Sequence, residues 1–441
     1  MAFVVGATVA QLFRQSGVEM WRTVWAEDGV VFYTEALERP LREILFDPYA
    51  GYALVVPRLL ASIGVNLPVE SYAWFTAVTS AAVASLFALF VYFASAPLLR
   101  SSVRQAILAG ALLFWPVLPY EVTGSMANIQ WVMIVGCLLA VLLPVAGPGA
   151  VAVRTVIVVL APLTSPLCVL FVPIAVWQLV LALRARTSRA RLVVPGAYLL
   201  SAATQVLIWF TADQAVRTDP DAGAFAVDVV KLYSTKVTTE FFFGSRVTDR
   251  LWPEFGYWLA ALSLVTMGCL LGWRWARAQS PARWFIAACV LASFVLYALS
   301  LWQRPNLIES MVVADGGPYN FLGMRYQLFP AGLLLLALLV RVDLPAAVFT
   351  DPDGRPPRAA RADVREHRVL LVAAAVWLAV AFVPSFRLTT LRSSGPDWVS
   401  GVAEAERACQ SRPDASAQVP ISPSPEWVVS VPCSSLVGSG R

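Results

Sequence analysis

Residues 72–96 read YAWFTAVTSAAVASLFALFVYFASA and contain no charged side chain. Coiled as an α-helix, this run extends about 37 Å, which exceeds the roughly 30 Å hydrocarbon core of a bilayer. Residues 129–147 form a second uncharged run. Continuous apolar runs predict helices, because a strand of a membrane β-barrel alternates apolar and polar residues over about ten positions. The two runs therefore predict an all-α, polytopic integral membrane protein.

The rest of the 441-residue chain repeats this pattern, since 58% of its residues are hydrophobic and only 14% are charged. That composition excludes an ordinary water-soluble globule. A short apolar run at 1–13 and ten longer runs predict about eleven transmembrane helices, within a range of 10–12. The further runs are 72–96, 105–119, 129–147, 150–163, 166–183, 192–211, 256–273, 284–302, 324–340 and 369–386.

The distribution of arginine predicts the orientation of these helices, because short loops rich in basic residues remain in the cytoplasm. The loops that carry arginine without acids are 97–104, 184–191 and 274–283. The acidic or mixed segments, expected outside, are 14–70, 119–128, 212–255 and 303–323. This alternation requires residues 150–183 to dip into the membrane and return, with a turn near Pro166. The alternation places the N-terminus and the loop 341–368 in the cytoplasm. Because the arginines serve to orient the helices, the net charge of +5 does not indicate a nucleic-acid partner.

Residues 387–441 form a short external tail that follows the transmembrane domain of residues 1–386. Cys409 and Cys433 lie 24 residues apart in this tail, and they are expected to form a disulfide in an oxidising compartment. A Ser- and Pro-rich tail buries little apolar area and needs such a link. Two unrelated free thiols are the alternative.

The first external loop begins with an acidic pair in Trp25-Ala26-Glu27-Asp28-Gly29. Ionised groups beside a low-dielectric boundary are costly, so adjacent carboxylates there indicate a functional site. The alternative is that Asp28 caps the following helix. Residues 35–46 then predict a short amphipathic helix in the membrane interface. Tyr52 lies in the return to the membrane, as an interfacial anchor or a stacking platform for a sugar.

Other polar residues are expected at the external ends of helices. Asn128 and Gln130 can hydrogen-bond sugar hydroxyls, or they can cap a helix. Arg325 and Arg304 suit the binding of a phosphate, because a guanidinium stays charged and bonds two oxygens at once. For Arg325 the alternatives are snorkelling at the interface or pairing with Asp315. The chain has a single histidine, and it shows no zinc, nucleotide or Ser-His-Asp motif.

Residues 1–386 resemble the GT-C superfamily of membrane glycosyltransferases. The features that carry the resemblance are an acidic pair after the first span, an interface helix, a Tyr-containing return to the membrane, many spans and a late external arginine. The resemblance implies transfer of a sugar from a polyprenyl-phosphate donor to an envelope glycan, lipid or protein acceptor, outside a bacterial inner membrane of actinobacterial type. It implies that Asp28 is the general base and that Glu27 orients the acceptor or, with Asp28, holds Mg²⁺ or Mn²⁺. It also implies that Arg325 and Arg304 bind the donor phosphate.

Two other functions remain open. A lipid-linked glycan flippase or transporter is expected to carry ionisable residues deep within its spans and to contain repeats. The sequence instead places ionisable groups at helix ends and shows no repeat. An O-antigen-type ligase or polymerase shares the donor class, but would concentrate basic residues in one large late external loop.

Overall fold

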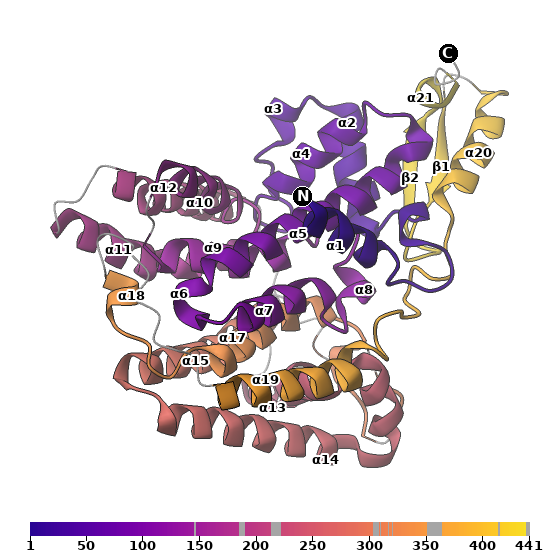
Figure 1. Ribbon diagram of the computed structural model, residues 1–441. Helices are drawn as coiled ribbons and strands as arrows, with labels where there is room; N and C mark the ends of the chain where they lie inside the picture. Colours follow the sequence, from indigo (N-terminus) through magenta and orange to yellow (C-terminus); the bar gives the residue numbers. More distant parts are fainter. Residues whose placement is uncertain are drawn as a thin grey trace.

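The computed structural model describes residues 1–144, 147–184, 190–212, 222–302, 308, 310–315, 317–319, 321–350, 364–412 and 415–437. The chain is mostly helical, at 73% (Figure 1). The helices long and apolar enough to cross a membrane are, in this described part, Val69–Ala94, Ser102–Glu121, Pro166–Arg184, Arg191–Thr211, Phe225–Arg277 and Ser280–Trp302. The helical class and the capacity to span a bilayer are thereby confirmed.

The N-terminal half packs around α5, which covers most of the uncharged run 72–96. α5 contacts α1, α7 and α9. Every residue of α9 is buried, as expected for a helix that is apolar on all sides. The bounds are α1 Ala2–Leu12, α5 Tyr72–Ala94, α6 Ala96–Leu99, α7 Ser102–Phe114, α8 Leu118–Glu121 and α9 Gln130–Leu142.

A turn divides residues 150–183 in two, as the sequence predicts. The backbone N–H of Ser165 donates to the carbonyl oxygen of Ala161 (2.8 Å), and Pro166 then begins a 3₁₀ segment because proline suits a first helical position. The bounds are α10 Pro148–Leu160, η4 Pro166–Phe171, α11 Val172–Arg184 and α12 Ala190–Thr211.

The segment predicted as an external loop, 212–255, is largely helical instead. Residues 222–255 belong to α13, a π-helix η5 and the start of α14. Lys236 and Glu240 lie four positions apart, so they share a face, and both are fully buried. The expectation that ionisable groups stay at helix ends is therefore wrong here. The bounds in this half are α13 Ala222–Leu232, η5 Tyr233–Thr239, α14 Glu240–Arg277, α15 Ser280–Trp302, η6 Met324–Gln327, α17 Leu328–Leu339, α18 Ala347–Thr350, α19 Val364–Trp377 and η7 Leu378–Phe382.

The predicted interface helix 35–46 is two short helices rather than one. Arg39 is extended (φ −138°, ψ 144°), because the following Pro40 disfavours helical backbone in the residue before it. The bounds in this segment are η1 Met20–Arg22, η2 Asp28–Tyr33, α2 Thr34–Glu38, α3 Leu41–Ile44, α4 Val55–Gly64 and η3 Val69–Ser71.

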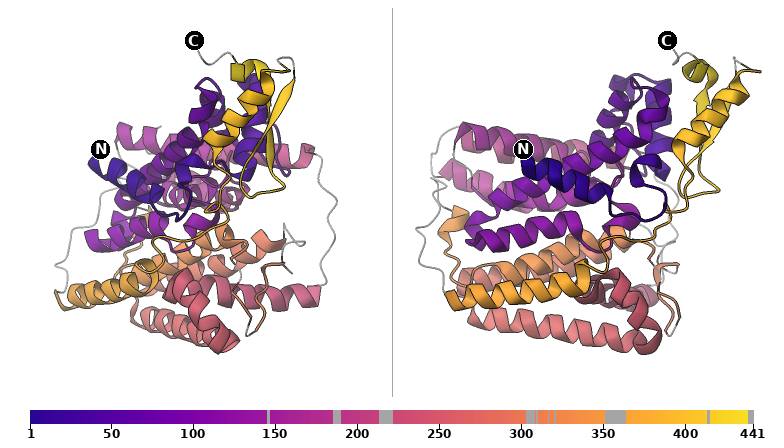
Figure 2. Two further views of the ribbon diagram at one scale, coloured as in Figure 1. Left: turned by 90° about the vertical axis from the view of Figure 1, so that its right-hand side faces the viewer. Right: turned by 45° about the vertical axis from the view of Figure 1, so that its right-hand side comes forward.

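The C-terminal tail packs on this same segment, as both views in Figure 2 show. Trp398 donates from its indole N–H to the carbonyl oxygen of Val69 (2.7 Å). A Cβ added to Gly29 would lie 2.7 Å from the side-chain end of Ile421 in the tail, so a larger residue there would force the tail side chains to shift. A disulfide joins Cys409 to Cys433, as the sequence predicts. The bounds are α20 Trp398–Cys409, β1 Ser416–Pro420, β2 Val428–Pro432, antiparallel to β1, and α21 Cys433–Val437.

Candidate functional site

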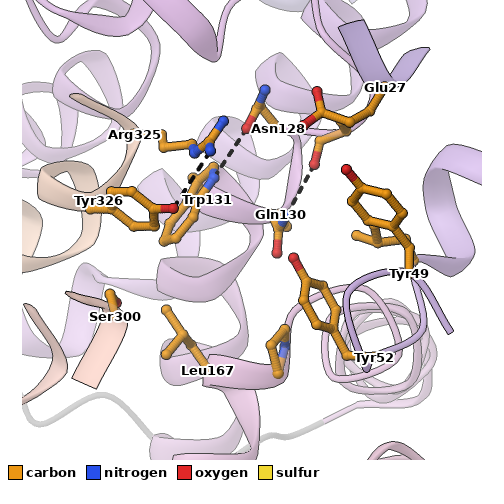
Figure 3. Close-up of a pocket in the computed structure, with 13 residues that line it drawn as sticks. Glu27, Tyr49, Tyr52, Asn128, Gln130, Trp131, Leu167, Ser300, Arg325 and Tyr326 are labelled. Atoms are coloured by element: carbon orange, nitrogen blue, oxygen red, sulfur yellow. Dashed lines mark hydrogen bonds between the residues drawn. The ribbon is translucent and has the colours of Figure 1, made fainter. Parts of the chain in front are cut away.

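A cavity with about 630 Å³ of empty space, counted out beyond its open mouth, lies at one end of the helices (Figure 3). Its walls come from the turn before η2, the start of α9, the start of η4, the end of α15 and the segment η6. The cavity therefore collects helix ends that are distant in the chain. It is lined by Glu27, Tyr49, Tyr52, Leu54, Ala127, Asn128, Gln130, Trp131, Pro166, Leu167, Ser300, Arg325 and Tyr326. Five of these thirteen are candidate residues from the sequence.

The two acidic neighbours of the first loop have different surroundings. Glu27 lines the cavity. Asp28 is fully buried beside it, and its carboxylate accepts hydrogen bonds from the backbone N–H groups of Met126 (3.0 Å) and Ala127 (2.8 Å). The hydroxyl of Ser125 donates to it as well (3.4 Å). Asp28 thus holds the chain that leads into α9 and does not cap its own helix.

Arg392 from the C-terminal tail approaches the same turn. Its guanidinium donates to the carbonyl oxygens of Thr123 (3.0 Å) and Gly124 (3.3 Å) and lies 5.1 Å from the ring centroid of Trp25. Burial lowers the pKa of Arg392 to about 10. Burial raises the pKa of Asp28 to about 7, although the hydrogen bond from Ala127 and the charge of Arg392 oppose this rise. Nothing local in the sequence connects Arg392 to the first loop, so the sequence alone does not identify this residue.

Arg325 faces the cavity from η6. Its backbone N–H donates to the carboxylate of Glu121 (3.1 Å), and its guanidinium lies 3.9 Å from the same group. The guanidinium also lies 5.2 Å from the ring centroid of Tyr326. Its partner is Glu121 and not Asp315, which instead accepts from the backbone N–H of Tyr257 (3.1 Å). A cation is thereby held in place while part of its surface faces the cavity.

Arg304 lies outside the described residues, so the structure places only one of the two proposed phosphate-binding arginines.

Asn128 lies between Glu27 and Arg325 in the cavity wall (Figure 3). Its side-chain amide donates to the carbonyl oxygen of Glu121 (3.0 Å), and its amide oxygen accepts from the indole N–H of Trp131 (3.3 Å). Gln130 donates to the carbonyl oxygen of Ala127 (3.1 Å). These bonds fix both amides at the start of α9, where each still borders the cavity.

Tyr49 and Tyr52 form the opposite wall. Their backbones pair across a tight turn, with N–H to carbonyl distances of 2.8 and 3.2 Å. Both rings face the cavity (Figure 3). Phe32 supports the first ring edge-on, at a centroid distance of 6.3 Å. Two aromatic rings beside amide groups form a surface suited to a sugar, whose ring has an apolar face and a polar edge.

The acidic pair does not fit the expected Mg²⁺ or Mn²⁺ site. Both oxygens of Asp28 already accept hydrogen bonds from the turn before α9, so only Glu27 offers a carboxylate to the cavity. Hard divalent cations need several oxygen ligands. Within the described ranges, no three His, Cys, Asp or Glu side chains are grouped closely enough to bind a metal ion.

Comparison of the chain with protein families, curated proteins and solved structures found no match. The chemistry of the cavity must therefore be inferred from its own residues. The carboxylate in the cavity can accept a proton, and the guanidinium opposite it can hold an anion. The two amides and two tyrosines can bind hydroxyl groups.

A chain of alternating charges extends from the cavity into the helices. Arg325 attracts the carboxylates of Glu121 and Glu27. Lys236 in turn attracts Glu240 and Glu121, and its ammonium lies 4.7 Å from the ring centroid of Tyr319. Neither Lys236 nor Glu240 was predicted from the sequence to have a role. The available signal was their four-residue spacing within an otherwise uncharged stretch, residues 232–245.

Proposed function

We propose that this chain is a membrane glycosyltransferase that transfers a sugar from a polyprenyl-phosphate donor to a hydroxyl group of an envelope glycan, lipid or protein. The observation that carries the proposal is the cavity in which Glu27, Arg325, Asn128, Gln130 and Tyr52 meet. These residues supply a base, a phosphate ligand and sugar contacts at one end of apolar helices. The proposal includes a GT-C-like arrangement of about eleven spans in a bacterial inner membrane, with the cavity on the external side.

Glu27 is the group best placed to act as the general base. Its carboxylate borders the cavity, whereas Asp28 is committed to the turn before α9. In the reaction, Glu27 takes the proton of the acceptor hydroxyl as that oxygen bonds to the anomeric carbon. The bond from this carbon to the phosphate oxygen breaks, and its electron pair leaves with the phosphate. Such base catalysis contributes roughly 10²–10⁴-fold. Asp28, which the sequence favoured as the base, becomes a positioning residue.

Arg325 is suited to the departing phosphate. Charge develops on the leaving oxygen, and a guanidinium held in advance stabilises it without reorganisation. Glu121 supplies that preorganisation through the backbone N–H and the guanidinium of Arg325. The apolar lining residues Leu54 and Leu167 suit the first isoprene units of the carrier.

The proposal is tested by transfer assays in liposomes that contain the purified full chain. The donors are polyprenyl-phosphate arabinofuranose and polyprenyl-phosphate mannose, and the acceptor is a membrane glycan extract. Glu27→Gln is expected to lower the rate about 10²–10⁴-fold. The matched control is Glu38→Gln, an exposed glutamate of the same segment, which should retain full activity. Full activity of Glu27→Gln would remove Glu27 as the base.

Transport of a lipid-linked glycan is the second candidate, favoured by one observation. Lys236 and Glu240 are fully buried ionisable residues within a span-length helical segment, and such residues often mark a transport path. The same liposomes separate the two functions. Movement of a fluorescent lipid-linked sugar between leaflets without acceptor would support transport, whereas acceptor-dependent transfer without such movement would support the transferase.

A further inference from the structure

A second pocket lies beside the candidate cavity, at the same end of the helices. It has about 1080 Å³ of empty space, counted out beyond its open mouth. Its walls come from the segment after α1, from α8, from the start of α14, from the residue Phe321 before η6 and from the segment that leads into the tail. Figure 1 shows α8 at the end of the helices that carries the tail. The pocket and the cavity have no lining residue in common.

A thin wall separates the pocket from the cavity. Tyr120 lines the pocket, whereas the next residue, Glu121, holds Arg325 in the cavity wall. Phe321 lines the pocket four residues before Arg325. The rings of Tyr120 and Phe321 stack, with centroids 4.4 Å apart and planes inclined by 8°. Consecutive residues are about 3.8 Å apart, so the two spaces adjoin and one short glycan chain can occupy both.

Arg387 is held at the pocket wall by the segment that follows α1. Its Nε–H donates to the carbonyl oxygen of Gln15 (3.1 Å), and the backbone N–H of Leu388 donates to the carbonyl oxygen of Arg14 (2.9 Å). The fully buried guanidinium of Arg14 in turn donates to the carbonyl oxygen of Phe386 (3.3 Å). Among the described residues, nothing forms a hydrogen bond or ion pair with the two terminal nitrogens of Arg387. These nitrogens are available to a ligand in the pocket.

Arg246 faces the same pocket from α14. Its backbone N–H donates to the hydroxyl of Ser385 (3.2 Å), which is fully buried two residues before Arg387. Both arginines are therefore anchored on one short strip of chain. The guanidinium of Arg246 has no hydrogen bond or ion pair within the part of the chain that the structure describes. Asp249 is the one acid in the pocket wall, so two guanidinium groups face a single carboxylate and the wall carries a net positive charge.

An acidic sugar matches this combination of groups. A guanidinium binds a carboxylate or a phosphate through two parallel N–H bonds. The hydroxyls of Ser16 and Thr389 hydrogen-bond each other (2.9 Å), and each keeps capacity for a further bond to a sugar hydroxyl. The rings of Tyr120 and Phe321 add an aromatic surface beside these polar groups, which suits the apolar face of a sugar ring.

We propose that this pocket binds an acidic sugar residue of the acceptor glycan, a uronate or a sugar phosphate, while the reacting hydroxyl of the same glycan lies at Glu27. The acceptor role rests on the proposed transferase function, whereas the affinity for an acidic sugar rests on the pocket alone. The strip that carries Arg387 continues to Arg392, which holds the turn before α9. The start of the tail therefore contributes both to acceptor selection and to the shape of the cavity.

The experiment measures binding of defined oligosaccharides to the full-length protein in phosphatidylcholine nanodiscs by isothermal titration calorimetry, with no donor present. The probes are tetragalacturonate, its methyl ester, which has the same size without the charges, and a mannotetraose phosphate. The wild type should bind one of the two acidic probes about tenfold more tightly than the ester. The tighter of the two identifies the acid as a carboxylate or a phosphate. Acid-selective binding without sugar transfer in liposomes would remove the transferase function and retain the pocket's ligand.

Three variants locate that binding in the pocket. Arg387→Gln should weaken the acidic probe about tenfold and leave the ester unchanged. Asp249→Asn should strengthen the acidic probe, because it removes the one negative group of the wall, and a misfolded variant would not bind more tightly. The matched control is Arg250→Gln, an exposed arginine of the same helix outside the pocket, which should bind as the wild type does. Equal binding of acidic and esterified probes by the wild type, or equal losses in Arg250→Gln and Arg387→Gln, would overturn the proposal.

Discussion

Asp28 and Arg392 hold one short turn, residues 123–127, from two sides. The Asp28 carboxylate accepts from the backbone N–H of Ala127 (2.8 Å), and the Arg392 guanidinium donates to the carbonyl oxygen of Thr123 (3.0 Å). A residue of the first loop and a residue of the tail therefore fix the same piece of backbone. That backbone leads directly into the cavity wall, so the two residues shape the site without facing it.

Asp28→Asn should lower both stability and activity, while Glu27→Gln lowers activity alone. The introduced side-chain amide would direct its N–H groups at backbone N–H donors, leaving buried groups unsatisfied at a cost of about 1–3 kcal/mol. Thermal unfolding in detergent, measured beside the transfer assay, distinguishes the two variants. A wild-type unfolding temperature for Asp28→Asn would show that the turn does not depend on this carboxylate.

The contribution of Asp28 to the stability of the protein should fall as the pH rises from about 4 to about 7. Asp28 titrates near its ordinary pKa of about 3.9 when unfolded, and near about 7 when folded. The folded state therefore binds the proton more tightly over this interval, and its contribution to stability is lost as the pH rises through the folded value. Unfolding curves of the wild type and Asp28→Asn across this range should converge toward higher pH. Parallel curves would contradict the raised pKa.

Removing the charge of Lys236 alone should destabilise the protein more than removing the charges of Lys236 and Glu240 together. Lys236→Met removes the cation that attracts buried Glu240, and breaking a buried pair in this way typically costs about 3–5 kcal/mol. Lys236→Met/Glu240→Gln removes both charges and should recover much of that loss. A double-mutant cycle by chemical denaturation measures the coupling. Additive effects of the two substitutions would show that the residues do not interact.

The tail should depend on its disulfide. Cys409→Ser/Cys433→Ser opens a loop of 24 residues, and the chain-entropy estimate for such a loop is about 3 kcal/mol. Because α20 and β2 pack on the first loop, the effect should reach the cavity and lower transfer activity as well. Reductant added to the wild type provides the comparison. Unchanged unfolding in both samples would contradict a stabilising role for the bridge.

Arg325→Gln should lower kcat more than it raises KM. The proposed contact strengthens as charge develops on the phosphate, and loss of one such preorganised donor costs roughly 10²–10³-fold in kcat. Arg250→Gln, an exposed arginine that does not line the cavity, is the control. A pure KM effect for Arg325→Gln would assign it to binding of the donor and not to the chemical step.

Local sequence was enough to predict most of the helices. A run such as 72–96 has one solution in a bilayer, because a helix satisfies its own backbone hydrogen bonds. The prediction of a loop at 212–255 was wrong, because a segment with scattered charges looks like a solvated loop unless the partners of those charges are known. Lys236 and Glu240 can be buried together because each charge has the other as a partner. Their burial also depends on helices that are distant in the chain, which the local sequence does not show.

The sequence by itself determined an apolar helical protein, and it named Glu27, Asn128, Gln130 and Arg325 individually. Only the tertiary structure decided that they line one cavity. It also decided that Glu27 and not Asp28 lines the cavity, because adjacent side chains point in different directions and the packing of residues 123–127 encloses Asp28. Helix formation depends on neighbours in the chain, whereas a site depends on which helix ends meet in space.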